Sequence, residues 1–471
     1  MQVQRPLRAQ LTMAILTGVA IFAVAGQPSA QQSAEGDVTI TLDEARIVAA
    51  KALRDGAPQL AEQLARGLLL ADAKSSYAHL VLATAQTNMG QTAQARKSAA
   101  KSYRYANTKP EKFQAAELAA KLAYAESRPT QAQLWLRRAA HNADNEQIEE
   151  QLGRDFQRVR AENPLSFSIR GALRPSSNVN NGADTALQII EGVPLTGSLS
   201  GSAQALSGTV ASADAVLGYR LRGTKASRTD ISARLFVGRV ALSSDAKALS
   251  PTSSNSDFAS TYGALTLSHS FAVGAQGGSA KLSASAGQFW SGGDRYYDFT
   301  RLDAARVWRL DAANRLQISA SVENRDIVNS ATNDAVAIGL NAELTHTRPG
   351  GDTLGFAFNV LETSSDSVNS DSTALSLSAR YTFADRIGPA QVSTGIVVGT
   401  TDYDRYFAAP IFLANGRQDH SAFADLNLFF PDIDYAGFAP TLALKAGRKT
   451  SNISRFETRE FSLSVGIASK F

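Results

Sequence analysis

The last eleven residues, Phe461-Ser-Leu-Ser-Val-Gly-Ile-Ala-Ser-Lys-Phe471, alternate between apolar and small or polar side chains. A period of two is that of a β-strand with one apolar and one polar face. The chain ends on an aromatic residue, and the polar face is built of small side chains. We therefore predict the closing strand of a transmembrane β-barrel, in which lipid covers one face and the lumen the other. An edge strand in a soluble sandwich is the alternative.

The N-terminus has the features of a secretory signal peptide. Arg5 and Arg8 precede an apolar run, Leu11–Ala25, that is shorter than the ~18 residues a membrane-spanning helix needs. Small residues at Ala23-Val24-Ala25 offer a cleavage site. We expect residues 1–25 to be removed and residues 26–41 to form a linker.

The composition excludes several kinds of chemistry. The chain has no cysteine, which excludes disulfides, thiolate metal sites and catalytic thiols. A formal net charge of +4 without a basic cluster argues against nucleic-acid binding. No later apolar run is long enough for a membrane helix. An exported membrane protein of this kind must be a barrel, because only a closed sheet satisfies every backbone polar group in lipid.

The chain divides into two halves near Asn163-Pro164. Residues 42–162 are rich in Ala, Leu, Gln, Glu and Arg, which favour helices. Residues 163–471 are rich in Ser, Gly, Thr, Val and Phe, with turn residues at regular intervals. We predict a helical domain followed by a β-barrel domain.

The helical half has the spacing of paired short helices, which we place at 77–89, 92–105, 113–127 and 130–142, after capping helices within 42–70. Small residues such as Ala83, Gly90 and Ala95 fit a tetratricopeptide pattern. Such repeats stack into a solenoid with a concave face that binds peptides. A plain helical bundle is the alternative.

The second half divides into fourteen predicted strands. Residues Leu316, Ile318 and Val322 share one face, whereas Gln317 and Ser319 point the other way, which is the apolar-out order of a membrane barrel. The predicted ranges are 165–173, 205–222, 228–242, 258–272, 278–290, 296–310, 313–325, 331–346, 353–364, 371–384, 389–403, 417–430, 437–449 and 456–471.

The connections predict the orientation of this barrel. Counted back from Phe471, the long loops 174–204 and 243–257 fall on one side and the short turns on the other. Long loops face outward in such barrels. The even strand number then places the helical domain in the periplasm. A barrel this wide has a lumen rather than a packed core, either a polar passage or one plugged by a loop.

Two groups of segments resemble a known family. One is Pro164-Leu-Ser-Phe-Ser-Ile-Arg-Gly171 with Ser177-Asn-Val-Asn-Asn181. The other comprises Gly416-Arg-Gln-Asp419, Gly437-Phe-Ala-Pro440, Ser451-Asn-Ile453, Gly466-Ile467 and Phe471. Together they resemble the surface lipoprotein assembly modulator (Slam) family, described as the type XI secretion translocon.

The resemblance implies a periplasmic tetratricopeptide domain joined to a fourteen-stranded outer-membrane barrel. It also implies a function, the transfer of surface lipoproteins or secreted haemophore-like proteins across the outer membrane, and neither enzymatic activity nor a cofactor. The terminal Phe471 resembles the signal read by the barrel-assembly machinery. The expected partners are a client protein, that machinery and outer-membrane lipid, with no nucleic acid, and we expect a monomer.

Several motif residues have a physical interpretation. Asn178 and Asn180 tolerate Asx turns and left-handed geometry, so they either pin a loop inside the lumen or form a plain surface turn. Arg417 and Asp419 share a strand face and can form an ion pair in the lumen. Pro440 removes a ladder donor, which either weakens pairing near an opening between the last and first strands or marks a bulge. The other motif positions are Gly437, Phe438, Ser451, Asn452 and Phe471. Of these, Ser451 and Asn452 predict a tight outer turn.

On the helical domain we predict client contact on the concave face, at Tyr77, Gln86, Tyr103 and Tyr124. Elsewhere the sequence offers little chemistry. None of the five histidines stands in an H-x-x-x-H pair. His420 near Asp402 and Asp404 has no serine motif to complete a hydrolase, and Asp432-Ile433-Asp434 is a solvated turn or a weak calcium site.

The alternative function is a repeat-linked porin that exports polysaccharide or small solutes. Carbohydrate paths carry aromatic tracks inside. We expect most strand aromatics here to face lipid or the rim, which favours the translocon.

Overall fold

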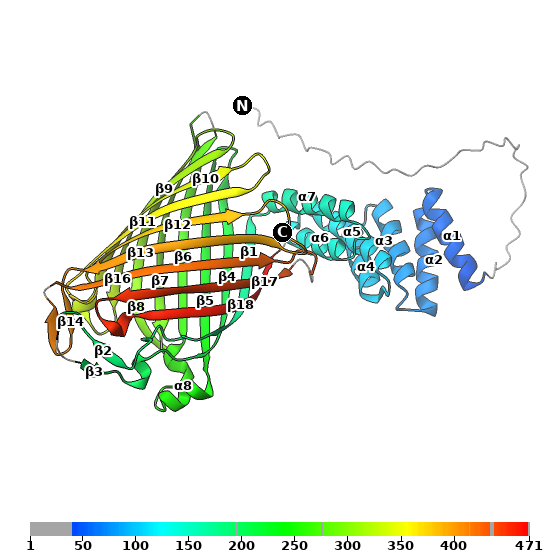
Figure 1. Cartoon of the computed structure of the whole chain (residues 1–471). Coiled ribbons are helices and arrows are strands. Elements are labelled where there is room, and N and C mark those ends of the chain that lie inside the picture. Colours follow the sequence, from blue (N-terminus) through cyan, green and yellow to red (C-terminus); the bar gives the residue numbers. More distant parts are fainter. Residues whose placement is uncertain (1–39, 194–195, 275–276, 414, 434–437, 470–471) are drawn as a thin grey trace, which may run out of the picture.

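The computed structural model describes residues 40–193, 196–274, 277–413, 415–433 and 438–469. Within these ranges, seven helices precede a closed antiparallel barrel of fourteen strands (Figure 1). This confirms the predicted fold class. The signal segment, most of the linker, Gly437 and Phe471 lie outside the described residues.

The helices of the N-terminal half run in hairpins. Their bounds are α1 Leu42–Arg54, α2 Pro58–Ala71, α3 Ser76–Asn88, α4 Thr92–Tyr105, α5 Lys109–Ala125, α6 Pro129–His141 and α7 Glu146–Glu162. Every predicted helix overlaps one of these, and α7 is an addition. Pro110 lies in the first turn of α5, where a missing N–H costs nothing.

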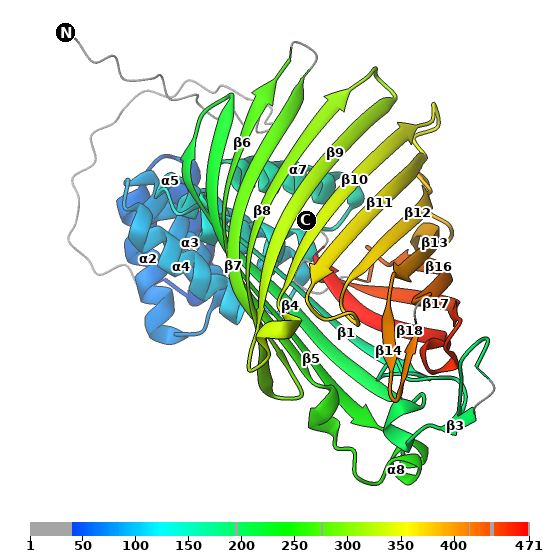
Figure 2. The same ribbon diagram turned by 90° about the vertical axis from the view of Figure 1, so that its left-hand side faces the viewer.

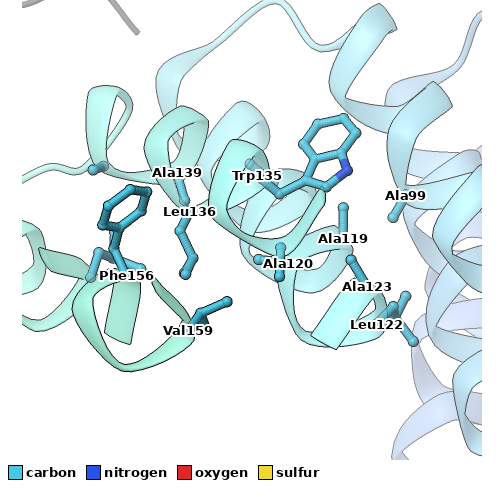
Figure 3. Packing of buried hydrophobic residues seen from close by; sticks show 14 of the residues in the cluster. Ala99, Ala119, Ala120, Leu122, Ala123, Trp135, Leu136, Ala139, Phe156 and Val159 are labelled. Atoms are coloured by element: carbon cyan, nitrogen blue, oxygen red, sulfur yellow. The ribbon is translucent and has the colours of Figure 1, made fainter. Parts of the chain in front are cut away.

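Packing in the helical domain is that of a repeat array. Each helix contacts the next, and α1 also contacts α3, as α3 does α5. Alanines at the contacts are fully buried, among them Ala99, Ala119 and Ala123, and their small size lets the helices approach closely. Figure 3 shows this core continuing through Trp135 and Leu136 to Phe156 and Val159 of α7. Among the described residues, no helix combines the length and apolarity needed to cross a membrane.

The barrel strands match the predicted ranges closely. Their bounds are β1 Leu165–Ser176, β4 Gly208–Gly223, β5 Ser227–Leu242, β6 Ser260–Val273, β7 Gly278–Ser291, β8 Asp294–Arg309, β9 Asn314–Ile327, β10 Ala335–Thr347, β11 Thr353–Ser365, β12 Ser372–Thr382, β13 Gln391–Tyr403, β16 Arg417–Phe429, β17 Phe438–Ser451 and β18 Thr458–Ser469. Each pairs antiparallel with its neighbours, and β1 closes on β18, beside which it lies in Figure 2.

The outer face of the barrel is apolar. Leu302, Phe461 and Leu265 leave 65%, 64% and 60% of their surface exposed. A band of exposed Leu, Ile, Val and Phe is unstable in water and suited to lipid, so this barrel is built to span a membrane. The opposite phase of the strands carries mostly Ser, Gly, Thr, Arg and acidic residues, as the alternating pattern predicts.

Small loop elements gather at the end of the barrel away from the helical domain (Figure 1). They are β2 Leu187–Ile189, β3 Thr196–Ser198, α8 Ser244–Leu249, β14 Tyr406–Ala408 and β15 Ile411–Leu413. The long connections and the helical domain therefore lie at opposite ends. We call the loop end the outer end below.

Candidate functional site

The lumen is lined by ion pairs that run between strands. Arg234 donates from Nε to Asp214 at 2.9 Å. Arg380 of β12 reaches Asp425 of β16 at 2.8 Å and passes over Gly395 of the strand between them, where a Cβ would lie 2.9 Å from the guanidinium. These pairs keep the wall polar and charged, as an aqueous passage requires.

One stretch of the luminal wall is aromatic. Tyr262 stacks on Phe299 with ring centroids 5.3 Å apart, and Phe289 stacks on Tyr297 at 5.2 Å. These residues occupy the strand phase opposite the lipid-facing Leu265 and Leu302. They face the lumen near its outer rim, because Tyr262 lies close to the start of β6 and Phe289 close to the end of β7. Other strand aromatics, among them Phe356, Phe358 and Phe461, face outward.

At the outer end, Arg417 and Asp419 form a buried ion pair. Nε and Nη2 of Arg417 donate to the two carboxylate oxygens at 3.0 and 2.5 Å. The two residues are 8% and 4% exposed. The guanidinium carbon lies 3.5 Å from the ring centroid of Phe456 and 4.4 Å from that of Tyr403, and Lys449 Nζ is 3.5 Å from Asp419. A forked pair held between rings fixes the outer ends of β13, β16 and β17 to one another.

Asn452 lies in the outer turn between β17 and β18 and binds the backbone next to Arg417. Its Oδ1 accepts from the backbone N–H of Gln418 at 2.9 Å, and its Nδ2 donates to the carbonyl of Gly416 at 3.1 Å. Gly416 has φ +69°, and a Cβ there would collide with the carbonyl of Tyr403. Ser451 Oγ accepts from the backbone N–H of Ile453 at 3.2 Å. Both motif residues therefore hold the backbone of the outer turn.

Asn178 and Asn180 pin the first outer loop, as one of the two alternatives predicts, but β2 and β3 of this loop lie at the outer end of the barrel (Figure 1). Asn178 exchanges two hydrogen bonds with the backbone of Gly182, at 2.8 and 2.9 Å. Asn180 donates to the carbonyl of Gln204 at 2.8 Å and accepts from the N–H of Leu206 at 2.9 Å. The two ends of the loop are thereby tied together.

This loop is also bonded to the last outer turn. Backbone N–H groups of Ile189 and Glu191 donate to Ser454 Oγ at 2.8 Å and to the carbonyl of Asn452 at 2.9 Å. Ile190 packs with Ile453 and Tyr406 in one buried cluster. Loops from both sides of the barrel closure thus form a single cap above it.

Below the cap, β1 closes the barrel against β18. Among the described residues, the two strands pair at four positions, the first Gly171 with Ile467 and the last Ser176 with Ser462. Every residue of β1 pairs with β4. The register carries residues 165–168 of β1 past the described end of β18. We call this β1–β18 junction the seam.

Pro440 lies next to the seam strand β18. It pairs with Ile467, and its carbonyl accepts from the N–H of Phe430 at 3.0 Å. The β17–β18 register continues through it without a shift over the described residues, so the predicted bulge is wrong.

The helical domain is attached on both sides of the seam. On the β1 side, Asn163 Oδ1 accepts from the N–H of Leu165 at 3.0 Å. On the other side, Arg137 of α6 donates from Nη2 to Ser469 Oγ at 2.9 Å, and its guanidinium lies 5.2 Å from the ring centroid of Phe438. Burial lowers the pKa of Arg137, and the charge of Arg160 lowers it further.

The predicted client-contact residues are scattered over the array. The Tyr77 hydroxyl donates to the carbonyl of Arg46 at 2.8 Å, and Tyr103 packs edge-on against Trp135. Gln86 is 4% exposed and accepts from Ser98 Oγ at 2.8 Å, so its side chain does not reach the surface and its predicted contact is corrected.

Tyr124 lines a small cleft between α5 and α7. Its hydroxyl donates to Glu162 at 2.9 Å, and this bond raises the pKa of Tyr124. Leu136, Leu152 and Val159 form the apolar floor of the cleft.

The structure brings no catalytic partners to His420 and no further metal ligands to Asp432 among the described residues. His420 sits in the outward phase of β16, with Ala422 and Ala424. Asp432 pairs with Arg386 at 2.8 Å, and Asp434 lies outside the described residues. In the described part of the chain, no three His, Cys, Asp or Glu side chains are grouped to hold a metal ion.

The fold and this geometry define a membrane-spanning β-barrel with a polar interior, an outer cap and an attached helical repeat domain. No family model matches the sequence, and no curated protein matches it.

Solved structures with similar folds exist for each half. The type III secretion translocator chaperone SycD of Yersinia enterocolitica is 16% identical with a TM-score of 0.24, over 26% of this chain and 84% of that one. An outer membrane channel from Pseudomonas putida F1 is 14% identical with a TM-score of 0.33, over 64% and 94%. OccAB3 of Acinetobacter baumannii is 10% identical with a TM-score of 0.36, over 64% and 99%. At these TM-scores the likeness carries no argument about function.

Proposed function

We propose that this protein is an outer-membrane translocon that transfers specific client proteins, surface lipoproteins or secreted haemophore-like proteins, to the cell surface. The observation that carries the proposal is the attachment of the helical array to both sides of the seam, through Asn163 to β1 and through Arg137 to β18. A repeat array that only tethered the barrel would need the covalent link alone. Because the array is attached to both strands of the seam, a client that binds the array can alter the pairing between β1 and β18.

The orientation follows from the ends of the barrel. The capped end faces outward, because long loops lie on the outer side of such barrels. The array then stands in the periplasm, where clients arrive. The cap ties together the loops above the seam through Asn178, Asn180, Asn452 and the Arg417–Asp419 pair, residues that also carry the resemblance to the Slam family.

Client contact on the array is assigned to the exposed parts of Tyr77, Tyr103 and Tyr124. Tyr124 offers the best defined surface, because it borders an apolar cleft whose rim carries Glu117, Lys121 and Arg158. Such a cleft suits one apolar side chain of an extended peptide. Tyr124→Ala should lower client display, and Tyr124→Phe, which removes only the bond to Glu162, serves as the matched control.

The test of the function is protease shaving of intact cells with and without the gene, followed by mass spectrometry of released peptides and culture medium. In cells without the gene, we expect one or a few proteins to be missing from the surface or medium and to accumulate in the periplasm. An unchanged set of surface and secreted proteins contradicts the translocon.

A second candidate is a porin for polysaccharide or small solutes, which the aromatic luminal wall at Tyr262, Phe289 and Tyr297 favours. Purified protein in lipid vesicles separates the two functions. A porin conducts small solutes without a client, whereas a gated translocon conducts little. Co-purification from detergent extracts tests the proposed association with the barrel-assembly machinery, and light scattering tests the proposed monomer.

A further inference from the structure

Helices α4 and α6 carry basic side chains and no acidic ones. Arg96 is neutralised by Glu126 at 3.1 Å, and Arg137 contacts the barrel. The remaining Lys and Arg residues are Lys97, Lys101 and Arg104 on α4 and Arg138 on α6. Across the described ranges, none of these four is in an ion pair. A set of unpaired cations on adjoining helices attracts an anionic partner.

Arg138 is held in place by two aromatic rings. Its guanidinium carbon lies 4.5 Å from the ring centroid of Trp135 and 5.6 Å from that of Tyr103, and the two rings meet edge to face at 5.4 Å. Cation–π contact orients the guanidinium plane and leaves its N–H groups for a ligand. The surrounding open depression has a volume of about 450 Å³ and is lined by Ala100, Lys101, Tyr103, Arg104, Trp135 and Arg138.

We infer that this depression binds an acidic segment of an extended polypeptide, with carboxylates held by Arg138, Lys101 and Arg104. The inference rests on the proposed function, in which the cargo is a protein, and it names the chemistry the array selects. An oriented guanidinium makes two parallel bonds to a carboxylate. Trp135 is only 8% exposed and Arg138 lies over it, so a sugar ring finds no open aromatic platform. This favours a peptide over an acidic polysaccharide.

The test measures fluorescence anisotropy of a labelled Glu-Gly repeat peptide with the full-length protein in a non-ionic detergent. The triple variant K101Q/R104Q/R138Q should bind about tenfold more weakly than the parent. The matched control K51Q/R54Q/K74Q removes the same charge from exposed sites on and beside α1 and α2, and should change affinity less than about twofold. Equal helical circular dichroism in all three proteins excludes misfolding as the cause.

Four outcomes overturn the inference. The first is no saturable binding of the acidic peptide, and the second is equal weakening of binding in both triple variants. The third is tighter binding of polyguluronate, an acidic polysaccharide, than of the peptide. The fourth is unchanged peptide affinity in Arg138→Lys, which keeps the charge but loses the planar guanidinium. Failure of the proposed function is separate. If protease shaving finds no client while the peptide still binds at these residues, the proposed translocon function is contradicted and the proposed peptide site is retained.

Discussion

Arg137 of α6 donates a hydrogen bond to Ser469 of β18 across 332 positions of sequence. The same helical domain continues covalently into β1, where Asn163 holds the first strand residue, Leu165. The two strands that close the barrel are therefore connected twice, through their own ladder and through the helical array. The array is placed to hold the inner end of the seam closed.

Replacing Arg137 by Met should loosen that end. The change removes a charge-assisted hydrogen bond and two cation–π contacts, to Phe438 and Phe156, together worth about 1–3 kcal/mol. Amide hydrogen exchange should accelerate about tenfold in residues 165–170 and 467–469, and stay unchanged in β12. Arg138→Met is the control, because Arg138 rests on Trp135 within the array. Equal protection in the two variants would show that Arg137 does not hold the seam.

A covalent bond across the seam should block export if the seam opens during transfer. Leu173 and Val465 are Cα partners in β1 and β18, and the native chain has no cysteine to interfere. We expect L173C/V465C to lose client display under oxidising conditions and to regain it after reduction. The control is L340C/V360C, a Cα-partner pair between β10 and β11. Normal export with a fully formed L173C/V465C disulfide would route the client through the lumen instead.

The Arg417–Asp419 pair should be costly to break. Replacing Arg417 by Met leaves a carboxylate that is 4% exposed, with Lys449 at 3.5 Å as the remaining cation, and losing one member of a buried pair costs about 3–5 kcal/mol. Trypsin should cut at Arg455 faster in this variant, because the turn that Phe456 anchors is released. Asp432→Asn breaks the exposed pair with Arg386 and should change little. Cleavage at the parental rate would mean that the aromatic rings alone hold the cap.

The strand positions were predictable because period-two alternation and turn residues are local signals. Whether a strand aromatic faces lipid or the lumen is harder to predict, because Tyr262 and Phe299 face the lumen and stack on each other over Gly287. Helix α7 has few apolar residues, so its sequence gave no separate repeat. Gln86 looked like a surface residue because nothing local shows that Ser98 bonds it in the core. The contact of Arg137 with Ser469 has no local signal. The basic depression could have been predicted from a local signal, because the sequences of α4 and α6 contain basic but no acidic residues.

The helical array should lose stability in mild acid through His79. This histidine is 5% exposed, stacks on Tyr105 at 5.6 Å, and places Nε2 3.2 Å from the carbonyl of Ala73. Burial lowers its pKa below the ordinary 6.5, the Ala73 carbonyl opposes this, and Lys101 and Asp72 act in opposite directions. The unfolded chain then binds the proton more readily than the folded one. The stability is complete above pH 6.5, falls as the pH drops below it, and levels off under the lowered folded pKa.

Urea unfolding followed by helical circular dichroism at pH 7.5 and pH 5.5 measures this effect in the full-length protein. The parent should show a lower midpoint at the acidic pH. His79→Gln keeps a donor for the Ala73 carbonyl but cannot titrate, so the acid-induced drop should shrink. His141→Gln replaces an exposed histidine and should leave the drop as it is in the parent. Because acidic residues elsewhere also titrate over this range, the decisive quantity is the difference between the two variants. If His79→Gln loses as much stability in acid as His141→Gln, the buried imidazole is not the source.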